Sequence, residues 1–200
     1  MGSKTKGRTF PPEIYSREEM KQLITACSHR APTGIRNRAL IVIGYRAGLR
    51  ITEALALRPK DVDTKNGVVR ILKGKGKKAR TVGLDPGACA IVDRWLDLRQ
   101  QLGFNGRQHL LCTLKGEQLK PSYVRTLMPR LGQKAGIDKR VHFHGLRHTF
   151  AWELSEEGIP VAKIQKLLGH ANLAITGQYL AHIAPHDLID SIRQREWVLD

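Results

Sequence analysis

Residues Val68–Pro86, with the sequence VVRILKGKGKKARTVGLDP, decide what kind of fold this chain forms. Two runs rich in apolar and β-branched residues, 68–72 and 80–84, flank a glycine- and lysine-rich turn at 73–78, which is typical of a β-hairpin. Asp85-Pro86 then supplies the N-cap and the first position of a helix. Helical spacing dominates on both sides of this stretch. The sequence therefore predicts a single α+β domain, mostly helical, with a small antiparallel β-sheet on one side.

Three helices are predicted before the hairpin. Ser16–Glu19 is a capping box, and apolar residues follow it at helical spacing. A second helix is expected over about 34–47, with Gly48 as its stop. Thr52 is the expected N-cap of a short third helix. Arg50 then falls at the junction between the second and third helices.

The rest of the chain is also predicted to be mainly helical. The helix that begins at Asp85-Pro86 is expected to bury Trp95, and the short apolar run 110–112 is expected to form a third, edge strand. Pro121 opens another helix, which Gly136 ends. The remaining predicted helices cover about 144–157, 160–168, 172–181 and 185–197.

The chain is strongly basic. Its 34 Lys and Arg residues against 18 Asp and Glu give a net charge of +16 and a pI of about 10.2. Such an excess favours a polyanionic partner, nucleic acid or an acidic membrane surface, over a cationic surface kept only for solubility. The chain has no long apolar run and its start is polar, so a membrane-spanning or secreted protein is not expected. We expect a cytoplasmic, nucleoid-associated protein.

The cysteines indicate neither disulfides nor a metal. Cys27, Cys89 and Cys112 are odd in number and widely spaced, and no CxxC motif is present. His109 and Cys112 have the spacing of half a metal site, but no second pair accompanies them. We therefore expect no metal and a reducing, intracellular setting.

The residues that carry chemistry gather in the last third of the chain. His144 and Arg147 lie three apart at the start of a predicted helix, so they share a face beside a helix N-terminus that favours phosphate. His170 follows a predicted helix stop at Gly169, and Tyr179 follows nine residues later. Arginine binds phosphate oxygens with paired donors, histidine transfers protons near neutral pH, and a tyrosine can attack phosphorus. Taken singly, each residue also fits ordinary packing or a solvated surface.

Two further segments supply cations. Arg50 stands three residues before Glu53, whose carboxylate is placed to hold the guanidinium, although a solvated helix end fits the same pattern. Lys75, at the tip of the hairpin, can reach into a groove and protonate a leaving oxygen. Some of the hairpin cations are expected only to touch DNA phosphates; these are Lys73, Lys77, Lys78 and Arg80.

In this order the residues resemble the catalytic pattern of the tyrosine recombinases, the phage-integrase family. The resemblance covers nearly all of residues 13–185. Four blocks carry it, and all four stand in the family's order and spacing, which makes coincidence implausible; they are GLRITEALAL (48–57), KGKGKKART (73–81), HFHGLRHTFA (142–151) and LLGHANLAITGQY (167–179).

The resemblance implies a role for each residue. Tyr179 would attack the scissile phosphate and form a 3′-phosphotyrosyl link, while Arg50 and Arg147 grip the non-bridging oxygens. Lys75 would protonate the departing 5′ oxygen, with Lys73 as the alternative because the hairpin is longer than usual. His144 would assist proton transfer at the nucleophile, and His170 would bond a phosphate oxygen. No metal, nucleotide or other cofactor is implied.

The resemblance also sets expectations for domains and partners. Residues 1–12 are expected to be a flexible basic leader, and 13–200 the catalytic domain, with no N-terminal core-binding domain. The partner would be double-stranded DNA, with a homo-oligomer (dimer or tetramer) forming on it from a chain that can be monomeric in isolation, and an accessory DNA-bending protein is an open possibility. An apolar stripe at Leu188, Ile189 and Ile192 would dock on a neighbouring protomer or in cis.

Two other functions fit part of the pattern. One is a DNA-binding regulator that keeps the fold without the reaction, but its site would be eroded, and here every position is filled. The other is a type IB topoisomerase, which shares the chemistry and relaxes supercoils without partners. The spacing of the blocks favours a recombinase over both.

Overall fold

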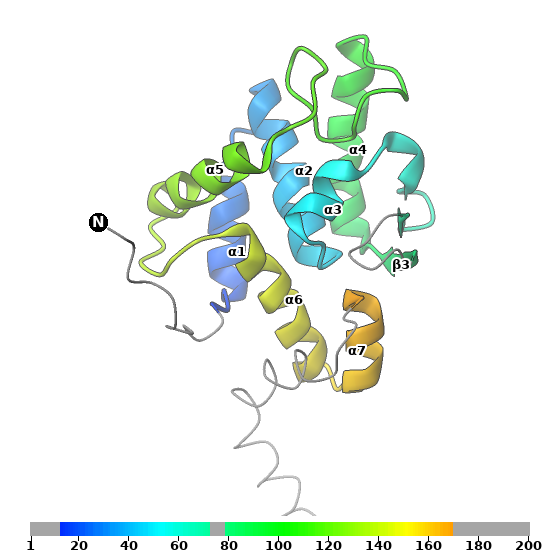
Figure 1. The fold of residues 1–200 in the computed structure, drawn as a ribbon. Coiled ribbons are helices and arrows are strands. Elements are labelled where there is room, and N and C mark those ends of the chain that lie inside the picture. Colours follow the sequence, from blue (N-terminus) through cyan, green and yellow to red (C-terminus); the bar gives the residue numbers. More distant parts are fainter. Residues whose placement is uncertain (1–12, 73–78, 170–200) are drawn as a thin grey trace, which may run out of the picture.

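The computed structural model describes residues 13–72 and 79–169 (Figure 1). Helices dominate the described residues, and a small antiparallel sheet lies at one side, which confirms the predicted α+β class. The elements in chain order are α1 (Arg17–Thr25), α2 (Pro32–Arg46), α3 (Ile51–Ala56), the 3-10 helix η1 (Pro59–Asp61), β1 (Val62–Asp63), β2 (Val68–Ile71), β3 (Arg80–Gly83), α4 (Pro86–Gln101), α5 (Pro121–Lys134), α6 (Phe143–Glu156) and α7 (Val161–Leu168).

Helix α2 is the centre of the core. Its apolar run Ala39–Ile43 is buried, and the helix packs mainly against α4 and α6. The contact with α6 depends on Gly44, because a Cβ atom there would lie 2.6 Å from Cζ of Phe143. Gly48 ends the segment as predicted, with a φ of +60° that suits glycine. This packing fixes the direction of α6, the helix that carries His144 and Arg147.

The sheet has the strand order β1-β2-β3 in the described residues, with both pairs antiparallel. Val69 pairs with Val82, and both side chains are buried against the helices. Arg70 and Thr81 pair on the opposite, exposed face. The two predicted strands are therefore confirmed, and the predicted turn at 73–78 lies outside the described residues.

The predicted edge strand at 110–112 is wrong. This segment is fully buried and takes part only in an isolated bridge between Cys112 and Gln118. Its backbone groups bond to different parts of the core: Leu110 N–H donates to Leu57 O at 2.7 Å, Trp95 Nε1–H donates to Leu110 O at 2.8 Å, and Leu119 N–H donates to Leu111 O at 3.3 Å. The third strand is β1, which is too short for a periodic signal.

Helix α3 begins earlier than predicted. Its N-cap is Arg50, with φ −69° and ψ 152°, and not Thr52. The Glu53 carboxylate accepts a hydrogen bond from the backbone N–H of Arg50 at 2.9 Å, which does the work of a capping side chain. As a consequence the Arg50 side chain leaves the chain at the very start of the helix, beside Glu53.

Three cysteines are buried as free thiols, at positions 27, 89 and 112. Within the described ranges, no helix is both long and apolar enough to cross a membrane.

Candidate active site

The site is built around one buried carboxylate. The Glu53 side chain is only 2% exposed. Its Oε1 accepts a hydrogen bond from Nη1 of Arg50 at 3.0 Å. Arg80 donates two parallel hydrogen bonds to it, Nη1 to Oε1 at 2.9 Å and Nη2 to Oε2 at 2.8 Å. A carboxylate bound by a planar guanidinium in this way holds both groups in one orientation. Glu53 therefore ties the start of α3 to strand β3, and the predicted bond from Glu53 to Arg50 is confirmed.

Arg147 reaches the same carboxylate from α6. Its Nη1 lies 3.9 Å from Glu53 Oε2 and donates to Gly48 O at 2.6 Å, while its Nη2 donates to Leu168 O at 2.7 Å. The side chain is 2% exposed. The end of α7 covers Arg147 through this bond to Leu168 O.

The last carbonyls of α7 bind the same arginines. Arg80 Nε donates to Leu167 O at 2.8 Å, and Arg50 Nη2 donates to Gly169 O at 3.4 Å, beside the bond from Arg147. Carbonyls at the C-terminus of a helix have no partner within the helix and carry partial negative charge, so guanidinium groups are suited to them. Arg50, Arg80 and Arg147 thus form an arginine cluster, which fixes the end of α7 against α3 and β3.

Gly169 is required at this end. It ends α7 in the left-handed region, at φ +63°, and a Cβ atom would lie 3.0 Å from Nη1 of Arg80. This confirms the predicted helix stop. The chain therefore leaves α7 beside the arginine cluster, immediately before position 170.

The arginines also set the charge of Glu53. Burial alone raises the pKa of a carboxyl, but the hydrogen bonds and positive charges of Arg80 and Arg50 outweigh it and lower the pKa of Glu53 to about 2. The carboxylate is therefore charged near neutral pH, and it keeps the guanidinium groups in place.

His144 stands one turn before Arg147 on α6 and has one side exposed to solvent. Partial removal of its ring from water, followed by the positive charges of Arg147, His142 and Arg50, lowers the pKa of His144 to about 4. Its ring meets that of His148 edge-on, with ring centroids 4.4 Å apart. His144 is therefore neutral near pH 7 and able to accept a proton.

Tyr15 anchors the start of α6, a role that the sequence did not indicate. Its hydroxyl accepts from His142 N–H at 3.0 Å and lies 3.1 Å from Arg140 O, to which it donates. Gly145 gives it room, because a Cβ atom there would lie 2.3 Å from the hydroxyl oxygen. His142 caps the helix by accepting from Gly145 N–H at 3.0 Å on Nδ1. These contacts set the position of His144.

The chain also matches known proteins. The model of the phage integrase family matches residues 14–186. Tyrosine recombinase XerC of Staphylococcus epidermidis is 30% identical over 183 residues, which are 92% of this chain and 61% of that protein. Tyrosine recombinase XerC of Vibrio cholerae serotype O1 is 35% identical over 174 residues, or 87% of this chain and 55% of that protein.

The chain belongs to the phage integrase family. It spans about three fifths of the length of these relatives.

Solved structures of family members agree. The crystal structure of XerA recombinase has a TM-score of 0.80 at 30% identity, covering 95% of this chain and 68% of that one. XerH site-specific recombinase bound to its palindromic difH substrate has a TM-score of 0.76 at 30% identity, over 96% of this chain and 55% of that one. The catalytic domain of bacteriophage HP1 integrase, at 22% identity and a TM-score of 0.61, shares the fold, over 91% of this chain and 94% of that one.

The structure brings together part of the predicted phage integrase site. Arg50 and Arg147 meet at Glu53, and His144 lies on the same helix as Arg147. The other predicted catalytic and DNA-binding residues lie outside the described residues; these are Lys73, Lys75, Lys77, Lys78, His170 and Tyr179. Within 13–72 and 79–169, no three His, Cys, Asp or Glu side chains gather as metal ligands do.

Arg80 differs from the expectation. The sequence placed it among the hairpin cations that touch DNA, but its side chain is only 11% exposed and points inward to Glu53. Strand β3 directs the side chain toward the helices. There Nη1 and Nη2 of Arg80 donate hydrogen bonds to the Glu53 carboxylate, and Nε donates one to Leu167 O at the end of α7. In this geometry the Arg80 guanidinium is bonded to Glu53 and to the end of α7.

Proposed function

We propose that this chain is the catalytic domain of a site-specific DNA recombinase that cuts and rejoins strands through a 3′-phosphotyrosyl intermediate. The observation that carries the proposal is the convergence of Arg50 and Arg147, from helices α3 and α6, on the buried carboxylate of Glu53. A fixed pair of guanidinium groups suits the negative oxygens of a phosphodiester during phosphoryl transfer. The membership in the phage integrase family and the likeness to XerC support the same activity.

In the proposed reaction, the phenolic oxygen of Tyr179 attacks the scissile phosphorus and the bond from phosphorus to the 5′ oxygen breaks. Neutral His144 takes the phenolic proton, and Lys75 gives a proton to the departing 5′ oxygen. Arg50 and Arg147 neutralise the non-bridging oxygens, whose charge is greatest in the transition state, and Arg147 reaches them when its bond to Leu168 O is released. Attack of a 5′ hydroxyl on the tyrosyl ester reverses every step and rejoins a strand.

Glu53 and Arg80 hold the site in position in the absence of DNA. Glu53 holds Arg50, whose side chain is 24% exposed and therefore open to an incoming phosphate. Arg80 holds Glu53 and the end of α7. His170, the next residue in the sequence after Gly169, would bond a phosphate oxygen. Because the guanidinium groups supply the positive charge and the ester conserves the bond energy, the proposed reaction needs neither metal nor nucleotide.

The proposed partner is double-stranded DNA. XerH has been solved on difH DNA before and after cleavage, and the net charge of +16 on this chain suits a polyanion. We further propose that two or four copies assemble on DNA in the cytoplasm, since two strands of each duplex have to be exchanged. Residues 13–200 would form this catalytic domain, with 1–12 as a basic leader.

A suicide substrate tests the proposal. A duplex nicked just beyond the cleavage site loses a short 5′-hydroxyl fragment, which traps the protein on the DNA. The wild-type chain is expected to form a covalent adduct whose DNA-linked peptide contains Tyr179, and Tyr179→Phe is expected to bind DNA without forming it. Tyr123→Phe is the matched control, because among the residues that the structure describes the Tyr123 hydroxyl bonds Arg36 and Asn37, away from the arginines at Glu53. An undiminished adduct in Tyr179→Phe rules out the proposed nucleophile.

A further inference from the structure

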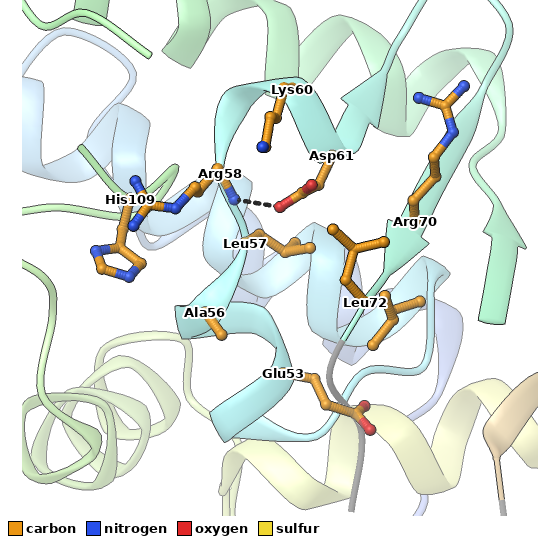
Figure 2. A pocket seen from close by; sticks show the side chains of 10 residues that line it. Glu53, Ala56, Leu57, Arg58, Lys60, Asp61, Arg70, Leu72 and His109 are labelled. Carbon is orange, nitrogen blue, oxygen red and sulfur yellow. Dashed lines mark hydrogen bonds between the residues drawn. The ribbon is translucent and has the colours of Figure 1, made fainter. Parts of the chain in front are cut away.

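A hollow of about 300 Å³ is lined in part by Glu53 (Figure 2). It is enclosed by α3, η1 and β2 and by the loop that carries His109. Buried Leu57 and Ile71 form its apolar floor. Figure 2 shows Arg58 and His109 on one side of the hollow and Arg70 on the other, with Glu53 at its far end.

Backbone contacts build this hollow. Leu110 N–H donates to Leu57 O at 2.7 Å, which brings His109 next to the end of α3. The Arg58 guanidinium donates to Arg107 O in the same loop, and Arg58 N–H donates to Asp61 Oδ2 at 2.8 Å. The walls are therefore held by hydrogen bonds from both sides, and the pocket does not depend on a single flexible side chain.

The charge in the hollow is positive. Arg58, Lys60 and Arg70 line it, and in the described part of the chain neither Lys60 nor Arg70 forms an ion pair. The two carboxylates at its edge are already engaged, Glu53 by Arg50 and Arg80 and the other, Asp61, by the backbone N–H of Arg58. Arg70 also lies close enough to Asp63 for its charge to contribute to lowering the pKa of that carboxyl, and Lys60 has no carboxylate within 4.0 Å among the described residues. Permanent cations that are not held in close ion pairs favour a phosphate from outside.

His109 adds a neutral donor to this wall. Partial removal of its ring from water and the charge of Arg58 lower the pKa of His109, so it is uncharged near neutral pH. A neutral imidazole can still donate one hydrogen bond to a phosphate oxygen.

The hollow shares Glu53 with the proposed binding site of the scissile phosphate. Glu53 lines the hollow and also binds Arg50, and Leu72, which lines it too, is the last described residue before position 73. We propose that this pocket is a second phosphate site, in which Lys60, Arg70 and Arg58 bind a backbone phosphate of the DNA other than the scissile one. This proposal rests on the proposed function for its partner. A contact of this kind fixes the register of the duplex without reading its sequence.

The first test removes charge from the pocket. Lys60→Gln/Arg70→Gln changes two exposed side chains, and Lys21→Gln/Lys115→Gln removes the same charge from two exposed positions elsewhere. The affinity for a labelled duplex is measured over a series of salt concentrations. We expect the slope of log affinity against log salt to become shallower by about one unit per phosphate lost in the pocket variant, and to stay unchanged in the control. Equal changes in both variants overturn the proposal.

The second test locates the phosphate. Single neutral methylphosphonate linkages are placed along the duplex, one position at a time, and the affinities of the wild type and of Lys60→Gln/Arg70→Gln are compared. The proposal predicts one position, away from the scissile phosphate, where the substitution weakens the wild type several-fold but leaves the already weakened variant unchanged. If every position weakens both proteins by the same factor, the pocket binds no phosphate.

The two proposals fail differently. A wild-type chain that forms no Tyr179 adduct on any suicide substrate removes the proposed function, whatever the pocket does. A wild-type chain that forms the adduct, with the same methylphosphonate profile as the pocket variant, removes only the second phosphate site.

Discussion

Arg80 and Glu53 form a two-point contact, with Nη1 to Oε1 at 2.9 Å and Nη2 to Oε2 at 2.8 Å, between side chains that are 11% and 2% exposed. The same guanidinium reaches the end of α7 through Nε. A buried pair of this geometry holds strand β3, helix α3 and helix α7 in register, and it places Arg50 where a phosphate can reach it.

Removing one partner of this pair should lower the stability of the fold. Arg80→Met leaves the buried carboxylate of Glu53 without its two-point partner, so we expect a loss of roughly 3 kcal/mol or more in the free energy of unfolding. Urea denaturation measures it. The double variant Arg80→Met/Glu53→Gln, which removes the stranded charge as well, should recover part of the loss. If the two single losses simply add in the double variant, the side chains do not act as a pair.

The pair of Arg80 and Glu53 should also make the stability of the fold depend on pH in the acid range. The pKa of Glu53 falls from the ordinary 4.5 to about 2 in the folded protein. Because the folded value is the lower one, the stabilisation is complete above about pH 4.5 and is lost as the pH falls toward 2. The difference in stability between the wild type and Glu53→Gln, from urea midpoints in a pH series, should shrink over this window. A difference that stays constant from pH 5 to pH 2.5 contradicts the assignment.

His144 should titrate far below an ordinary histidine. Partial burial of the ring, together with Arg147, His142 and Arg50, lowers its pKa to about 4, so NMR of the DNA-free protein should show its ring resonance moving with a midpoint near that pH. His144→Gln identifies the resonance and, as loss of a general base, should slow adduct formation about 100-fold. A midpoint near the ordinary 6.5 means that the ring is not under the influence of the arginines.

Gly169→Ala tests the contact between the end of α7 and Arg80. The backbone at Gly169 has φ +63°, and the new methyl group would lie 3.0 Å from the guanidinium. Gly158→Ala is the matched control, because Gly158 has φ +74° and nothing within 4 Å of its Cβ position. Both should lose about 1 kcal/mol of stability to the backbone conformation. We expect only Gly169→Ala to slow adduct formation as well, and equal rates in the two variants would show that Arg80 is free to move aside.

Local signals predicted much of the fold. The capping box at Ser16–Glu19, the Asp85-Pro86 helix start and the stop at Gly48 depend on neighbours in sequence, and all three are confirmed. The strand predicted at 110–112 is wrong because Leu110 bonds to Leu57 and to Trp95 across the core, and periodicity in the sequence does not reveal such contacts.

The sequence predicted the residues of the candidate site better than it predicted their hydrogen-bond partners. The bond between Arg50 and Glu53 spans three positions and follows from spacing. Thr52 is the better N-cap by residue type, yet Arg50 takes that place because Glu53 reaches back to its N–H. Arg80 stands in a run of similar cations, and only the position of Glu53 in space distinguishes it from lysines of the same run.

The central claim is that the guanidinium group held by Glu53 stabilises the transition state of strand cleavage. Single-turnover formation of the adduct on a suicide substrate, with protein in excess, tests it in Arg50→Ala against Arg30→Ala, an exposed arginine in the turn before α2. We predict a fall of about 1,000-fold or more in the rate for Arg50→Ala, with DNA affinity changed far less, and no fall for Arg30→Ala. An adduct rate in Arg50→Ala equal to that of the wild type would contradict the account.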